Sequence, residues 1–154
     1  MSEAPLPTLA EVRERAIKLL ARREHAPAEL AQKLRKRSYP SDLIDTALAE
    51  LIEQNLLSST RYAEALVRNR IEKGYGPLRL RDELGGKQIE QNIIDAALHN
   101  AEVDWFELAA GVRSKRFGTK LPATFPDKAK QMRFLQQRGF AGEQIQAAFT
   151  IYPQ

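Results

Sequence analysis

The chain has 154 residues, which is enough for one domain or several small ones. Hydrophobic residues make up 43% of it, and this composition excludes a disordered chain. It contains no Cys, which excludes disulfides and thiolate chemistry and fits a cytoplasmic protein. No apolar run approaches the roughly 18 residues that a transmembrane helix needs, and residues 1–9 lack the charged and apolar regions of a signal peptide.

Helix signals follow one another along the whole chain. Thr8, with Glu11 three residues later, is typical of a capping box before the first helix. Pro27 and Pro77 are each placed to open a helix, because Pro fits the first turn of a helix and breaks its interior. No stretch alternates apolar and polar residues as a strand does. The expected helices are 10–23, 27–37, 41–52, 59–73, 77–84, 90–99, 104–116, 127–138 and 143–151.

The stretch 73–77, Lys-Gly-Tyr-Gly-Pro, separates two helices near the middle of the chain. Gly74 and Gly76 can both take positive φ, which suits a helix end followed by a tight turn. Basic residues lie on both sides, so we expect a hinge with cationic flanks. A second pair of glycines, Gly85 and Gly86, is expected to form the turn after the next helix.

The same plan occurs three times. A shift of 50 residues places Leu34 on Leu84, and a further shift of 51 places Leu84 on Leu135. Under the first shift Pro27 also falls on Pro77. Repeats of this size each bury a small core and depend on their neighbours. The sequence therefore predicts an all-α fold, in which three tandem three-helix repeats form an elongated, curved, solenoid-like chain. The expected divisions are a flexible N-terminus at 1–8 and repeats at 9–57, 58–101 and 102–154.

Charge alternates in blocks along these repeats. Basic blocks at 11–37, 61–87 and 113–138 are separated by blocks at 38–60 and 88–112, which contain acids but no Lys or Arg. The third basic block has eight basic residues against one acid, and the second has seven against four. Acids inside the second block are expected to pair with its arginines. The net charge of +4 indicates an anionic partner only weakly, and solvated helix faces are the alternative explanation of the blocks.

The candidate contact residues for a partner or for DNA come from the second and third basic blocks. Basic side chains with an interleaved aromatic suit a phosphate backbone and an unstacked base. Tyr75 and Phe117 occupy matching positions beside Gly, but either could instead plug a junction between helices, which is the favoured interpretation for Phe117. A helix-turn-helix reader of duplex DNA is a less favoured alternative, because the sequence shows no recognition helix rich in Arg, Asn and Gln. The candidates are Arg68, Arg70, Lys73, Tyr75, Arg79, Arg81, Arg113, Lys115, Arg116, Lys120, Lys128, Lys130 and Arg133.

No catalytic or metal-binding set is visible in the sequence. His25 and His99 have no partner at metal-ligand spacing, so a structural role is favoured for both. The glycines near the centre lack the Lys-Ser/Thr of a phosphate-binding loop. The acids of the third expected helix resemble a solvated face more than a catalytic pair; they are Asp42, Asp45, Glu50 and Glu53. The sequence therefore predicts a binding protein, without catalytic residues, metal or cofactor.

Several stretches together carry a family pattern that covers about 11–149. They are AIKLLARREH at 16–25, LSSTRYA at 57–63, RIEKGYGP at 70–77 and RFLQQRGF at 133–140. With these stretches the chain resembles the RecX family, bacterial regulatory proteins of the RecA recombinase. It departs from the family pattern at Ser58-Ser59, where an acid is usual, which bears on the capping of the second repeat. It departs again at Gln88, where Gly is usual, which leaves open which residue takes the left-handed conformation.

The resemblance implies a nine-helix protein that lodges in the groove of the filament formed by RecA and single-stranded DNA. There it would inhibit recombinase, ATPase and coprotease activities and so modulate DNA repair, homologous recombination and the SOS response. The implied partners are RecA, the RecA–DNA filament and single-stranded DNA, with duplex DNA bound weakly. The expected state is a cytoplasmic monomer that makes no contact with a membrane. The alternative is a stand-alone helical nucleic-acid-binding protein, and a purely structural scaffold is a third interpretation.

Overall fold

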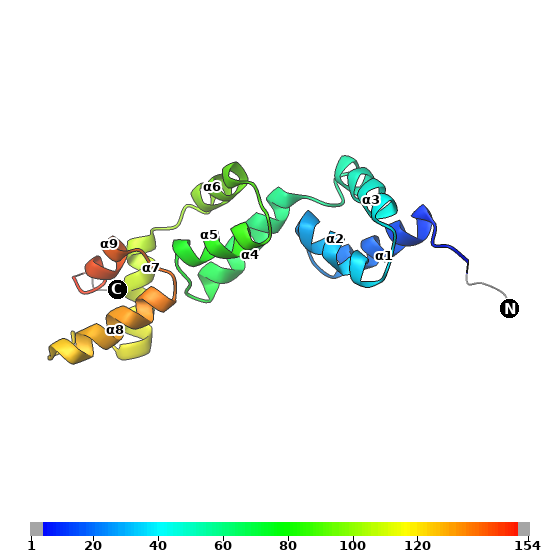
Figure 1. Ribbon diagram of the computed structural model, residues 1–154. Coiled ribbons are helices and arrows are strands. Elements are labelled where there is room, and N and C mark those ends of the chain that lie inside the picture. Colours follow the sequence, from blue (N-terminus) through cyan, green and yellow to red (C-terminus); the bar gives the residue numbers. More distant parts are fainter. Residues whose placement is uncertain (1–4, 151–154) are drawn as a thin grey trace.

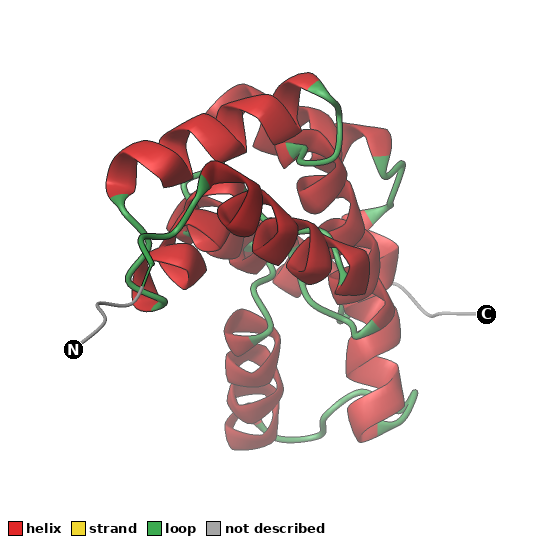
Figure 2. Ribbon diagram, turned by 90° about the vertical axis from the view of Figure 1, so that its right-hand side faces the viewer, coloured by secondary structure: helices red, strands yellow, loops and turns green. Residues whose placement is uncertain are grey.

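The structure is a computed structural model that describes residues 5–150. Within that range it contains nine helices and no strand (Figure 1, Figure 2). The parts of the expected N-terminus and third repeat at 1–4 and 151–154 lie outside the described residues. The helices are α1 (Leu9–Arg22), α2 (Pro27–Lys36), α3 (Ser41–Glu53), α4 (Ser59–Glu72), α5 (Pro77–Gly86), α6 (Gln91–Asn100), α7 (Trp105–Phe117), α8 (Phe125–Gln137) and α9 (Gly142–Ala147).

The first helix of each repeat begins at a polar cap. The Thr8 hydroxyl accepts a hydrogen bond from the Glu11 N–H at the start of α1, at 3.2 Å. Ser58 caps α4 in the same way, so the cap is present although the chain has Ser58-Ser59 here. The Asp104 carboxylate accepts from two N–H groups at the start of α7. Caps of this kind each stabilise a helix by about 1 kcal/mol, and they fix where each repeat starts.

Each repeat buries its own core. The extensive helix contacts join α1, α2 and α3, then α4, α5 and α6, then α7, α8 and α9. Leu34, Leu84 and Leu135 are all fully buried, one in each core, which confirms the repeat alignment. The three repeats follow one another in a row, so the molecule is elongated (Figure 1). In residues 5–150 no helix has the length and apolar character needed to cross a bilayer.

The middle helix of each repeat is followed, at an equivalent position, by a residue in the left-handed backbone conformation. Ser38, Gln88 and Gly139 have φ of 64°, 59° and 94°. The prediction of a turn at Gly85-Gly86 is wrong, because α5 continues through both residues. Gln88 takes the left-handed conformation instead. The Ile89 N–H reaches back to the Leu84 carbonyl at 3.1 Å, as in a Schellman helix end. Burial of Ile89 holds this end in place although Gln88 is not glycine.

Candidate nucleic-acid interface

The second and third repeats meet backbone against backbone. The Gly76 N–H donates to the Arg138 carbonyl at 2.7 Å, and the Leu78 N–H donates to the Gly139 carbonyl at 2.9 Å. A Cβ on Gly76 would lie 2.5 Å from the Gly139 backbone. Gly74 has the expected positive φ of 80°, but Gly76 does not, since its φ is −91°. Gly76 is therefore needed for close approach between the repeats, and the expectation of positive φ there is wrong.

Tyr75 lies at this junction between two guanidinium groups. Its ring centroid is 4.0 Å from the Arg79 Cζ and 4.8 Å from the Arg138 Cζ. Arg138 also donates to the Lys73 carbonyl, at 2.8 Å. The ring is half-buried. These contacts give Tyr75 a packing role between the repeats, and they tie the turn expected to be a hinge to the third repeat.

Ion pairs compensate most of the central arginines. Glu83 accepts from Arg70 at 2.8 Å and from Arg79 at 3.3 Å. Arg81 pairs with Asp95, at 2.7 Å. The remaining candidates of this block, Arg68 and Lys73, are exposed. Three of the five central cations therefore have an acidic partner within the protein, with Arg70 and Arg79 sharing Glu83.

The cations of the third repeat are uncompensated. No ion pair within residues 5–150 involves any of them. Asp127 is the only acid of the block 113–138. Lys128 is half-buried beside the Phe149 ring, and the others are exposed. This set, called the third-repeat cations below, consists of Lys115, Arg116, Lys120, Lys128, Lys130 and Arg133.

Arg113 does not belong with them, which corrects its place among the surface candidates. It is fully buried, and it donates to the Ala148 carbonyl at 3.0 Å and to the Gln131 Oε1 at 3.2 Å. It thus joins α7 to the helices that follow. The sequence carried a signal for this position, because Arg113 is three and four residues from the buried Ala110 and Ala109 on one helix face.

Phe117 also packs inside the third repeat. Its ring meets the Phe134 ring edge-on, with centroids 5.4 Å apart. The Arg116 guanidinium lies 5.6 Å from the Phe134 centroid. This arrangement fits the structural interpretation favoured for Phe117 and leaves the Arg116 charge at the surface.

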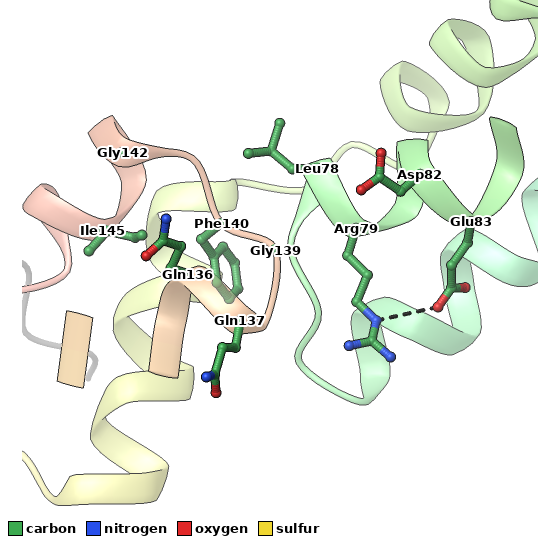
Figure 3. A pocket seen from close by; sticks show the side chains of 10 residues that line it. All are labelled: Leu78, Arg79, Asp82, Glu83, Gln136, Gln137, Gly139, Phe140, Gly142 and Ile145. Atoms are coloured by element: carbon green, nitrogen blue, oxygen red, sulfur yellow. Dashed lines mark hydrogen bonds and ion pairs between the residues drawn. The ribbon is translucent and has the colours of Figure 1, made fainter. Parts of the chain in front are cut away.

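A cleft of about 600 Å³ lies between the second and third repeats (Figure 3). One wall is α5, with Asp82 and the Arg79–Glu83 ion pair, and the other carries Gln136 and Gln137. Carboxylates and neutral amides do not attract phosphate, so this cleft is not part of the basic surface. This cleft could not be predicted from the sequence, because its walls come from two repeats.

The junction between the first and second repeats is built from side chains. Ala26 stands where the second repeat has Gly76, and it is fully buried in the core of the second repeat. Among residues 5–150 no backbone hydrogen bond crosses at Ala26. Glu29 instead accepts from Arg23 at 2.8 Å and from Lys87 at 3.3 Å. Burial alone would raise the pKa of Glu29, but the hydrogen bond and charge of Arg23, with the charge of Lys87, lower it to about 2.

His25 is buried beside this junction, with 1% of its surface exposed. Its Nδ1 lies 3.1 Å from the Arg23 carbonyl oxygen, and its Nε2 lies 2.8 Å from the Lys33 ammonium. Nε2 must accept from Lys33, so the imidazole is neutral and Nδ1–H donates to Arg23. Burial lowers the pKa of His25, the carbonyl of Arg23 opposes this, and the charges of Arg23 and Lys33 add to the lowering. Glu29 is the nearby acid that opposes them.

Stability is expected to fall as pH drops below the ordinary His pKa of about 6.5 because of His25. The unfolded chain binds a proton at the ordinary His pKa, whereas the folded chain resists it. The stabilisation is therefore complete above that value and is lost as pH falls toward the lower folded pKa. His25→Gln keeps a donor and an acceptor but cannot titrate. Thermal denaturation at a series of pH values below the ordinary His pKa should show the melting temperature of the parent falling more than that of the variant. Parallel curves would contradict this role for His25.

The described residues 5–150 hold no group of three His, Asp or Glu side chains placed to bind a metal ion. The candidate interface consists of cations and aromatic rings, which can bind anions and planar groups.

Comparison with known proteins covers all three repeats. Residues 13–51, 60–98 and 102–149 match the profiles described as the first, second and third three-helix domains of RecX. The regulatory protein RecX of Halorhodospira halophila is 45% identical over 148 residues, which cover 96% of this chain and 91% of that protein. The regulatory protein RecX of Pseudomonas fluorescens (strain Pf-5) is 44% identical over 142 residues, 92% of each chain.

Two crystal structures share the fold. RecX from Lactobacillus salivarius has a TM-score of 0.76 at 21% identity, covering 92% of this chain and 94% of that chain. A second regulatory protein RecX has a TM-score of 0.80 at 23% identity, covering 93% of this chain and 73% of that chain. The chain therefore belongs to the RecX family, because its three repeats match the three RecX domains and it is about 45% identical to proteins named regulatory protein RecX.

Proposed function

We propose that this protein regulates the RecA recombinase by binding in the groove of the RecA filament on single-stranded DNA. Bound there, it inhibits recombinase, ATPase and coprotease activities and so modulates DNA repair, homologous recombination and the SOS response. It acts as a cytoplasmic monomer and not as an enzyme. The observation that carries the proposal is the set of uncompensated third-repeat cations at one end of an elongated RecX-family fold.

The distribution of charge supports contact with both components of a filament. In Figure 1, α3 and α6 lie along the upper edge of the molecule, whereas α8 lies at the lower edge. The acids Asp42, Asp45 and Glu53 of α3 are exposed and belong to a block without Lys or Arg. Phosphates attract the third-repeat cations, and basic protein surface attracts the acids. An elongated molecule can place these two edges against different parts of a groove.

The test is the ATPase activity of RecA on single-stranded DNA, measured while this protein is titrated in. We expect inhibition at well below one molecule per RecA protomer, because a ligand in the groove acts on many protomers of one filament. Inhibition only near one-to-one ratios, with no effect on assembled filaments, would indicate sequestration of free RecA. No inhibition at any ratio would contradict regulation.

A second candidate function is nucleic-acid binding without a filament partner. The uncompensated third-repeat cations favour it, since they need only phosphate to bind. Pull-down of RecA in the presence and absence of DNA separates the two functions. Capture of RecA supports the regulator, and capture of DNA alone supports the stand-alone binder.

A further inference from the structure

One large aromatic side chain of the third repeat has no packing role. Phe125 is 78% exposed, compared with 39% for Phe106. Phe117 and Phe134 of the same repeat pack against each other, and Tyr75 is held between guanidinium groups. A partner that covered the exposed ring would remove apolar surface from water, so the ring can contribute to binding.

The ring is presented from a fixed position. Phe125 is the first residue of α8 and is followed by Pro126, whose φ is restricted. Thr124 caps the helix, with its hydroxyl 3.3 Å from the Asp127 N–H. The start of α8 projects at the end of the molecule opposite α1 (Figure 1). Because the backbone is already ordered, binding at the ring would need little further ordering.

The charge around Phe125 indicates which partner the ring fits. Lys120 precedes it in the loop, and Lys128 and Lys130 follow it in α8, while Asp127 is the only nearby acid in sequence. None of these lysines forms an ion pair within residues 5–150. An apolar pocket on a protein would accept the ring but would leave the lysines without partners. An unstacked base between phosphates satisfies both.

We propose that Phe125 stacks against an unpaired nucleobase of single-stranded DNA, while Lys120, Lys128 and Lys130 bind the adjoining phosphates. This rests on the proposed contact between the third repeat and DNA and adds the atoms that select a single strand. In duplex DNA the faces of the bases are covered by their neighbours, so the ring gains nothing there. Selectivity for single strands thus comes from one side chain, and the lysines bind either form.

The experiment compares three probes of equal length: oligothymidylate, the same strand made entirely of abasic sites, and a duplex. Phe125→Ala should lower affinity for oligothymidylate about 5- to 100-fold and leave affinity for the abasic strand and the duplex unchanged. Phe125→Trp should bind as the parent does. Its fluorescence should change with oligothymidylate and not with the abasic strand, and this change should exceed that of Trp105 in the parent. The matched control is Leu56→Ala, which truncates a 46% exposed side chain of the first repeat. It should leave the affinity for all three probes unchanged.

The outcomes distinguish base stacking by Phe125 from DNA binding by the third-repeat cations. Normal binding by Phe125→Ala, combined with loss of binding when the third-repeat cations are neutralised, would overturn stacking and leave the DNA contact in place. Equal losses by Phe125→Ala on the base-containing and abasic strands would also overturn stacking. Normal DNA binding with weaker binding to RecA alone would assign the ring to a protein pocket. If neutralising the cations changes no DNA affinity, the proposed DNA contact fails as well.

Discussion

Replacing Gly76 with Ala is expected to lower the free energy of unfolding by about 1–3 kcal/mol, as overpacking of a tight contact does. The new Cβ would lie 2.5 Å from the backbone of Gly139, and backbone atoms cannot move aside as the end of a side chain can. The two hydrogen bonds from Gly76 and Leu78 would lengthen or break. Urea denaturation measures the loss. Small-angle scattering should also show a larger radius of gyration as the third repeat separates from the second.

Gly86→Ala is the matched control for this change. Gly86 is the last residue of α5, at the other end of this helix from Gly76, and a Cβ there would meet nothing within 4 Å. Ala is favoured over Gly inside a helix by about 0.5–1 kcal/mol, so this variant should be neutral or stabilised. If both variants unfold at the same urea concentration, the contact between Gly76 and Gly139 does not hold the repeats together.

The fold could be predicted because each repeat is specified locally. Caps such as Thr8, initiating prolines such as Pro27 and the repeated Leu34, Leu84 and Leu135 lie within a few turns of the structure they determine. The error at Gly85-Gly86 has a tertiary cause. The buried Ile89 fixes where the helix ends, and this outweighs the preference of glycine for turns.

The candidate site could be predicted only in part, because its properties depend on contacts between distant residues. Arg81 is neutralised by Asp95 and Arg70 by Glu83, acids 14 and 13 residues away in sequence. Arg113 had the charge of a surface residue but lies on a buried helix face. Phe125 was not among the candidates, and nothing in its sequence context distinguishes an exposed ring from a core ring.

Neutralising four third-repeat cations is expected to weaken binding to single-stranded DNA far more than neutralising four central arginines. The two variants carry the same change in charge. One replaces Lys115, Arg116, Lys128 and Lys130 with Gln, and the other replaces Arg68, Arg70, Arg79 and Arg81 with Gln. In the central set Arg70, Arg79 and Arg81 already have acidic partners, so they release few counterions when DNA binds. The third-repeat set has none among the described residues.

Both variants should keep their helices, because none of these side chains is fully buried. Lys128 lies beside the ring of the core residue Phe149, so the third-repeat variant should lose some thermal stability. Arg79 also stacks on Tyr75, so the central variant should lose some thermal stability while it stays folded. Circular dichroism at the assay temperature is the control for folding.

The decisive measurement is the slope of the logarithm of DNA affinity against the logarithm of salt concentration. Each phosphate contact on a single strand contributes about 0.7 to this slope, so the third-repeat variant should have a slope shallower by about 3 if all four cations bind phosphate. The central variant should keep nearly the slope of the parent. The opposite result, with both variants folded, would place the DNA contact at the turn around Tyr75 and contradict the third repeat as the DNA-binding surface.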